Sequence, residues 1–175
     1  MPAPDPRLLE SLPYRKEAFL IDEVLEVDEP ARRLRARLRT TKPMPLLDLV
    51  RASPVHPPHL PGGLLVHLTG MLGCLHAYRL HGVRFDEGWI GYGTRIHRAE
   101  FRKLVRVGPD LDLECAETRA RLSPDRQIVR YEFRFTQEGD LRYFGEQTAI
   151  WLRGAAALAL AAGEAGGAGE AGGEA

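Results

Sequence analysis

Residues 63–81 constrain the fold of this chain more than any other segment. The segment contains no proline, and its apolar residues recur at spacings of three and four, which is the period of an α-helix. The series is Leu64, Leu68, Met71, Leu72 and Leu75. Such residues cover most of the helix circumference, so the helix must be buried, and Gly82 marks its end.

Segments typical of β-strands flank this helix on both sides. The expected strands are residues 19–27 and 33–40 before it, and 89–101, 111–121, 127–137 and 141–152 after it. Short turn sequences such as Gly108-Pro109 and Gly139-Asp140 separate the last four, as in antiparallel sheets. The order predicts an α+β domain in which an antiparallel sheet wraps the helix, because no other layer is available to cover it. The open sheet edge favours pairing of two domains.

The chain is expected to form one domain, residues 1–153, followed by a tail at 154–175. Its 175 residues suffice for a single core without metals or disulfides. The tail is almost entirely Ala, Gly and Glu and is predicted to be disordered, although AAALALAA could extend a helix briefly. A short helical turn is expected at 7–12, and the proline-rich residues 43–61 are expected to be irregular.

Charge and cysteine content exclude several functions. The formal net charge is zero, so no global field attracts nucleic acid or an anionic membrane. Cys74 and Cys115 form no CxxC motif and are predicted to be buried thiols in a reducing compartment, with neither metal nor cofactor. The start lacks a signal-peptide pattern, and the longest apolar stretch, residues 62–75, is too short to span a bilayer. We therefore expect a cytoplasmic protein.

Three segments resemble one enzyme family in order and approximate spacing. They are Leu12-Pro13-Tyr14-Arg15 followed by Phe-Leu-Ile-Asp-Glu-Val-Leu at 19–25, then His-Pro-Pro-His-Leu-Pro-Gly at 56–62, then Phe-Arg-Lys-Leu-Val-Arg-Val-Gly-Pro-Asp at 101–110. Together they resemble the β-hydroxyacyl-acyl-carrier-protein dehydratases, which have the hot-dog fold. The resemblance covers residues 12–152. It implies a homodimer or dimer-based oligomer that eliminates water from a 3-hydroxyacyl thioester of acyl carrier protein or coenzyme A.

The resemblance also implies a loop histidine as catalytic base and a carboxylate one turn or so into the helix. His56 is the first choice for the base and His59 the second, since a neutral imidazole accepts protons near pH 7. The acidic position falls on His67, a poor substitute, because a neutral imidazole must be protonated before it can donate a proton. Asp48 and Glu100 are fallback carboxylates.

Two further sets of residues are expected to contact the substrate and its carrier. Pro61, Gly62 and Gly63 are predicted to bind the substrate, because free N–H groups at a helix start can polarise a thioester carbonyl. The predicted dock for an acidic carrier protein is the basic cluster Arg98, Arg102, Lys103 and Arg106. No Asp or Glu occurs in residues 62–73, so an acyl thioesterase and a catalytically degenerate binding or structural subunit stay open as alternatives.

Overall fold

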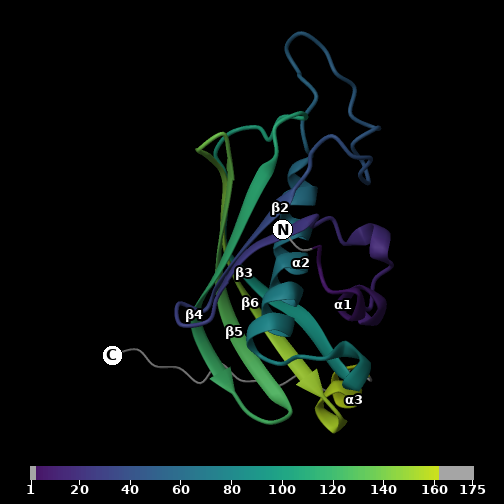
Figure 1. Ribbon diagram of the computed structural model, residues 1–175, viewed down its shortest axis with the longest axis vertical. Helices are drawn as coiled ribbons and strands as arrows, with labels where there is room; N and C mark the ends of the chain where they lie inside the picture. The colour runs from purple at the N-terminus through teal and green to yellow at the C-terminus, as the bar shows by residue number, and fades with distance from the viewer. Residues whose placement is uncertain (1–2, 162–175) are drawn as a thin grey trace.

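The computed structural model describes residues 3–161, whose strands form one antiparallel sheet. The strands are β1 Glu23–Asp28, β2 Arg33–Leu38, β3 Trp89–Phe101, β4 Leu111–Leu122, β5 Arg126–Gln137 and β6 Asp140–Arg153. They lie in the order β1-β2-β4-β5-β6-β3. The helices are α1 Pro6–Ser11, α2 Gly62–Leu80 and α3 Ala155–Ala161, with 3₁₀ turns η1 Lys16–Ala18 and η2 Phe85–Glu87. The predicted architecture, a curved antiparallel sheet around one long helix, is confirmed (Figure 1).

Helix α2 lies against the sheet and carries much of the core (Figure 1). Twelve of its nineteen residues are buried, as its apolar pattern requires. Leu68 and Leu72 are fully buried in one cluster with inward side chains of β4 and β5, such as Leu113 and Phe133. None of the helices within residues 3–161 has the length and apolar character needed to cross a bilayer.

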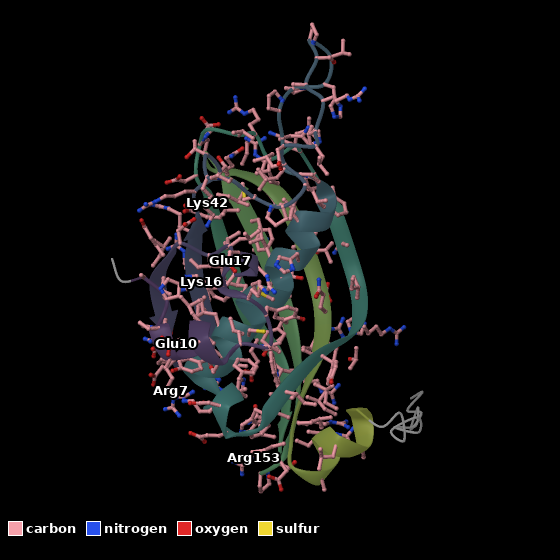
Figure 2. The ribbon with its side chains drawn as sticks, turned by 90° about the vertical axis from the view of Figure 1, so that its right-hand side faces the viewer. Arg7, Glu10, Lys16, Glu17, Lys42 and Arg153 are labelled. Atoms are coloured by element: carbon pink, nitrogen blue, oxygen red, sulfur yellow. The ribbon has the colours of Figure 1, made fainter. Side chains whose placement is uncertain are left out.

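The N-terminal segment covers the side of α2 that faces away from the sheet (Figure 1). The sequence pattern predicted that the sheet alone would cover the helix. Leu8 and Phe19 of this segment are buried. The Tyr78 hydroxyl donates to Asp5 at 2.9 Å, and Arg7 pairs with Asp86 of η2 at 2.7 Å. Figure 2 looks onto this side and labels Arg7 with other charged residues of the segment. A helix that is apolar all round needs cover on both sides, and residues 4–21 supply the second.

Element ends differ from expectation at a few places with identifiable causes. Strand β1 begins at Glu23 rather than residue 19, and before it the Leu20 carbonyl accepts a hydrogen bond from the Lys42 ammonium at 2.6 Å. Strand β2 ends at Leu38, and Thr40 instead donates to the Pro109 carbonyl at 2.9 Å. Residues 43–61 contain neither helix nor strand, as predicted. The predicted tail begins with α3, and its remainder from residue 162 lies outside the described residues.

Two glycines of β3 provide a matched test of packing. A Cβ added at Gly91 would lie 2.1 Å from Trp151 Cζ3, whereas one at Gly93 would meet nothing within 4 Å. Gly91→Ala is therefore expected to lower the free energy of unfolding by about 1–3 kcal/mol through overpacking. Gly93→Ala should change it by less than about 0.5 kcal/mol. Denaturant unfolding of both variants measures the difference, and equal stabilities would contradict this packing.

A polar cluster lies at the C-terminal end of α2. His76 is fully buried and donates from Nε2 to the Arg32 carbonyl at 2.9 Å, while His81 Nε2 lies 2.7 Å from Glu117 Oε2. Donor atoms of His76, His81 and Glu117 lie within 4.8 Å of one another, a spacing that a metal could use. The Arg32 guanidinium already lies 3.0 Å from His81 Nδ1, and its positive charge opposes a second cation there. The geometry favours a structural hydrogen-bond network.

This cluster makes stability depend on pH. Burial lowers the pKa of His76 from 6.5 to about 4, so between these values the unfolded chain binds a proton that the folded chain excludes. The free energy of unfolding should therefore fall by about 2–3 kcal/mol as the pH is lowered through this window. His76→Gln keeps a donor for the Arg32 carbonyl but does not titrate, and urea unfolding between these pH values should show a weaker dependence. His81, whose pKa burial also lowers, leaves a residual slope. An unchanged slope in the variant would contradict the assignment.

Candidate active site

A cleft of about 420 Å³ opens at the start of α2. Its walls are His59, Leu60, Gly62 and Leu65 on one side and residues 101–105 on the other. The Leu60 N–H donates to the Val105 carbonyl at 2.9 Å, and His59 forms an isolated bridge with Arg106. These contacts fix the end of the proline-rich loop against the chain that follows β3. They place a histidine beside the helix start.

A hydrogen bond to the backbone indicates which nitrogen of the His59 ring carries the hydrogen. Its Nδ1 lies 2.8 Å from the Pro57 carbonyl oxygen. Because a carbonyl only accepts hydrogen bonds, Nδ1 carries the hydrogen and Nε2 of the neutral ring keeps a free lone pair. The exposed His56 is adjacent, with its ring centroid 4.7 Å from that of His59 in an edge arrangement. The structure thus brings the two loop histidines together.

His67 does not join this group. It lies on α2, half-buried, and its Nε2 is 2.7 Å from the Ala18 carbonyl oxygen of η1. That oxygen accepts a hydrogen bond from the ring's N–H. The neutral imidazole therefore has no second N–H with which to protonate a leaving group. In this structure His67 ties the N-terminal segment to α2.

The helix start has the features expected of a carbonyl-binding site. Pro61 is the N-cap residue of α2, and the first N–H groups that follow it have no intrahelical acceptor. Gly62 lines the cleft, and a Cβ there would lie 3.0 Å from Phe101 Cε1. Gly63 is exposed, with nothing within 4 Å of an added Cβ. A substrate oxygen can therefore approach the backbone closely at Gly63, whereas the Phe101 ring occupies the space beside Gly62.

Neither the expected carboxylate nor the expected basic dock is available as an unpaired group at the cleft. Among the described residues that line the cleft, none is Asp or Glu. Asp48 is exposed in the proline-rich loop. Each member of the basic cluster has an acidic partner: Arg98 and Arg102 pair with Glu100, Lys103 with Asp140, and Arg106 with Glu138. The positive charge of this cluster is largely compensated.

A narrow slot of about 80 Å³ runs between α2 and strands β3, β5 and β6. The sequence did not identify the residues that line it. Thr69, Gly70 and Gly73 line it from the helix. Gly62, Leu65, Thr69 and Gly73 recur every three or four residues, so the slot and the cleft share one face of α2. The sequence signal that could have located the slot is the presence of Gly70 and Gly73 inside a helix, since glycine there is less favourable than alanine by about 1 kcal/mol. Such glycines leave room for a ligand.

Polar contacts are few along the slot. Gln147 Nε2 donates to Thr69 Oγ1 at 2.7 Å, and Trp151 Nε1 donates to the Tyr131 hydroxyl at 3.3 Å. Cys74 also lines the slot, and burial raises the pKa of its thiol to about 12. That thiol is a poor nucleophile near neutral pH. The slot is suited to hold an apolar chain.

Comparisons with known proteins agree with this architecture. No family model matches the chain. It is 28% identical over 144 residues to 3-hydroxyacyl-acyl-carrier-protein dehydratase FabZ of Aromatoleum aromaticum, covering 81% of this chain and 92% of that protein. It is 27% identical over 137 residues to the FabZ of Polaromonas naphthalenivorans, covering 77% and 92% respectively.

Solved structures show the same fold at lower identity. The dehydratase heterocomplex ApeI:P from Xenorhabdus doucetiae matches with a TM-score of 0.65 and 12% identity, over 89% of this chain and 97% of that one. A mutant thioesterase from Pseudomonas aeruginosa matches with a TM-score of 0.55 and 18% identity, over 83% and 91%. The chain therefore has the hot-dog fold and is similar in sequence to 3-hydroxyacyl-acyl-carrier-protein dehydratases.

Proposed function

We propose that this protein removes water from 3-hydroxyacyl thioesters, carried by acyl carrier protein or coenzyme A, to give trans-2-enoyl thioesters. The supporting observation is the position of His59, whose free Nε2 shares a cleft with the first turn of α2. The names of the sequence relatives support the same reaction class. The two buried thiols fit a reducing setting such as the cytoplasm.

The proposed reaction needs one histidine and a backbone donor. The thioester carbonyl accepts hydrogen bonds from N–H groups at Gly62 and Gly63, which stabilise the enolate oxygen. His59 Nε2 takes the α-proton, and the resulting imidazolium returns a proton to the β-hydroxyl. The C–O bond then breaks, water leaves, the carbon–carbon double bond forms, and His59 is neutral again. A single histidine suits a cleft whose described lining contains no carboxylate.

The acyl chain would extend from this cleft into the slot. The cleft and the slot share one face of α2, so the chain would pass Leu65 and Thr69 on its way to Gly73. The apolar lining stabilises each buried methylene by about 0.8 kcal/mol. The Thr69–Gln147 hydrogen bond would close one wall of the passage.

A second candidate is an acyl-binding subunit without activity of its own. Two observations favour it: the missing carboxylate in the cleft and the Ala18 bond that occupies His67. The structural neighbour ApeI:P is itself a dehydratase heterocomplex. A thioesterase would need a group that activates water, and likeness to thioesterase structures concerns the fold alone.

An activity assay separates these candidates. The protein is incubated with a 3-hydroxyacyl thioester and a crotonyl-type thioester, each on acyl carrier protein and on coenzyme A. We expect enoyl thioester to form from the hydroxy substrate. We also expect the reverse reaction, in which water adds to the crotonyl substrate. Release of free thiol would establish a thioesterase instead. Binding without turnover would establish the subunit and overturn the dehydratase proposal.

We also propose that two copies pair through β3. This strand lies at the sheet edge, and residues 92–99 are exposed along it, including Ile96 at 52% of its surface. A long unpaired edge favours strand addition from another chain. Light scattering should give twice the chain mass, and Ile96→Lys should shift the protein toward monomer. A monomeric wild-type protein would contradict the proposal.

A further inference from the structure

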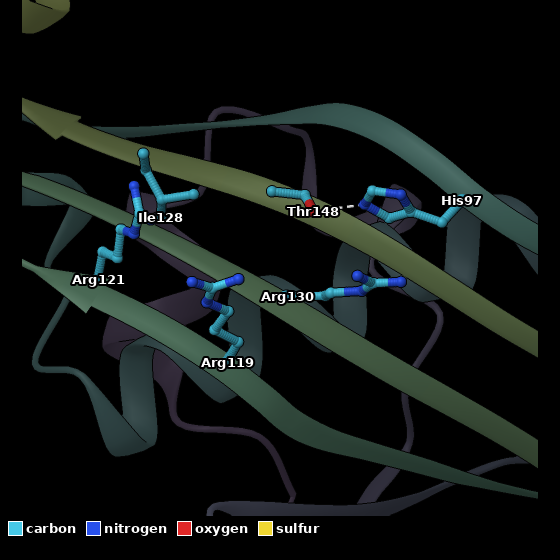
Figure 3. Close-up of a pocket in the computed structure, with 6 residues that line it drawn as sticks. All are labelled: His97, Arg119, Arg121, Ile128, Arg130 and Thr148. Carbon is cyan, nitrogen blue, oxygen red and sulfur yellow. Dashed lines mark hydrogen bonds between the residues drawn. The ribbon is translucent and has the colours of Figure 1, made fainter. Parts of the chain in front are cut away.

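A shallow basic pocket of about 200 Å³ lies on the outer face of the sheet (Figure 3). It is lined by His97, Arg119, Arg121, Ile128, Arg130 and Thr148. These residues come from β3, β4, β5 and β6. The acyl slot lies against the opposite face of β3, β5 and β6, with Gln147 and Ala149 inward on either side of Thr148. The two sites are therefore separate.

A β-bulge in β4 brings Arg119 and Arg121 to this face. Before the bulge in β4, the odd-numbered residues point inward, as the buried Leu113 and Cys115 show. The register shifts between Glu117 and Arg119, and after it Arg119 and Arg121 point outward. Without the extra residue, the period of two would direct both arginines into the core. Strand β3 has two register shifts of its own beside the pocket, between residues 93 and 98.

The arrangement concentrates positive charge that is only partly compensated, by one carboxylate. Arg119 stands directly opposite Arg130 on the neighbouring strand, a pairing of like charges that disfavours folding. Arg130 binds Glu146 at 2.7 Å, but Arg119 and Arg121 form no ion pair with any carboxylate within residues 3–161. The cluster around Glu100 differs, because each of its cations has an acidic partner. An anion would relieve the repulsion in the pocket.

Neutral hydrogen-bonding groups complete the pocket. His97 Nε2 lies 2.7 Å from the Thr148 hydroxyl, the bond drawn in Figure 3. Desolvation, followed by the charges of Arg130 and Arg95, lowers the pKa of His97, so its ring is neutral near pH 7. Arg95 is the strand partner of Thr148 and extends the cationic row to the sheet edge. Ile128 gives the pocket an apolar wall.

We infer that this pocket binds a phosphate ester group. Guanidinium groups bind phosphate oxygens through two parallel hydrogen bonds, and the Thr148 hydroxyl can add a third donor. The phosphate of a nucleotide and that of a phosphopantetheine arm offer the same chemistry to this pocket. The inference is independent of the dehydratase proposal, because it concerns the other face of the sheet.

Calorimetric titration of the full chain tests this inference. The probes are pyrophosphate, adenosine 3′,5′-bisphosphate and phosphopantetheine. For each probe that binds the wild type, the double variant Arg119→Gln/Arg121→Gln should have an affinity at least about tenfold lower. This is the loss expected for one charge-assisted hydrogen bond. The matched control Arg33→Gln/Arg35→Gln removes the same charge from β2, where each arginine pairs with a carboxylate away from the cleft and the slot, and should bind like the wild type.

Two further measurements keep the result interpretable. The Arg119/Arg121 variant should melt no lower than the wild type, because it removes like-charge repulsion. Thr148→Val, which deletes one donor and no charge, should also weaken binding. Tighter binding of the nucleotide or of phosphopantetheine identifies the source of the phosphate. No binding to the wild type, or an equal loss in the control, would overturn the inference.

Discussion

His59→Ala is expected to lower kcat/KM for dehydration of a 3-hydroxyacyl thioester by about 10²–10⁴-fold, the range for loss of a general acid–base group. His59 is the one histidine that lines the cleft at the start of α2, among the residues that the structure describes there. Its Nδ1 bond to Pro57 leaves Nε2 free to accept a proton. Steady-state kinetics on wild type and variant measure the loss.

The neighbouring histidine provides the comparison. His56 is exposed and contacts the His59 ring from the edge, so His56→Ala should cost less activity than His59→Ala. His67→Gln keeps a donor for the Ala18 carbonyl and should mainly preserve the attachment of the N-terminal segment. A His59→Ala enzyme with wild-type kcat/KM would remove this histidine from the mechanism. A larger loss in His56→Ala would transfer the role to that residue.

Gly73→Leu is expected to exclude long acyl chains from the slot. A Cβ at Gly73 would meet only Tyr131 Cε2, at 4.0 Å, so the position tolerates a side chain that extends into the slot. If about four methylenes of the acyl chain are no longer buried, the binding free energy weakens by about 3 kcal/mol. This lowers kcat/KM by about 200-fold. A four-carbon substrate does not reach this depth and should react nearly as before.

The control for this variant changes the same residue. Gly73→Ala adds one methyl group in ordinary contact with Tyr131 and leaves most of the slot open. It should therefore keep the wild-type preference for chain length. Competition between a short and a long 3-hydroxyacyl thioester measures that preference for all three proteins. An unchanged preference in Gly73→Leu would show that the acyl chain lies elsewhere.

Local patterns in the sequence determined the elements of this fold. The repeat of leucines at three and four residues located α2 to within one residue at each end, and alternation located β3 at its observed bounds. Packing on the far side of α2 depends on long-range contacts, such as Tyr78 with Asp5, that no local pattern encodes. The cover supplied by the N-terminal segment was therefore missed.

The candidate site was predictable only in its chemistry. The motif at 56–62 identified two histidines and the glycines at the helix start, with His56 as the preferred base, whereas we now propose His59. That choice depends on the bridge of His59 to Arg106 and on its bond to Pro57. The outward turn of Arg119 follows from a bulge in β4, and a bulge shifts the alternation by one residue without a sequence signal of its own.

A crystal structure with a non-reactive 3-hydroxyacyl thioester analogue would show whether the substrate binds at the start of α2. We expect the carbonyl oxygen at the N–H groups of Gly62 and Gly63, with His59 Nε2 beside the proton on the α-carbon. The acyl chain should run along α2 toward Gly73. An analogue bound away from this helix face, or a saturated protein with an empty slot, would contradict it.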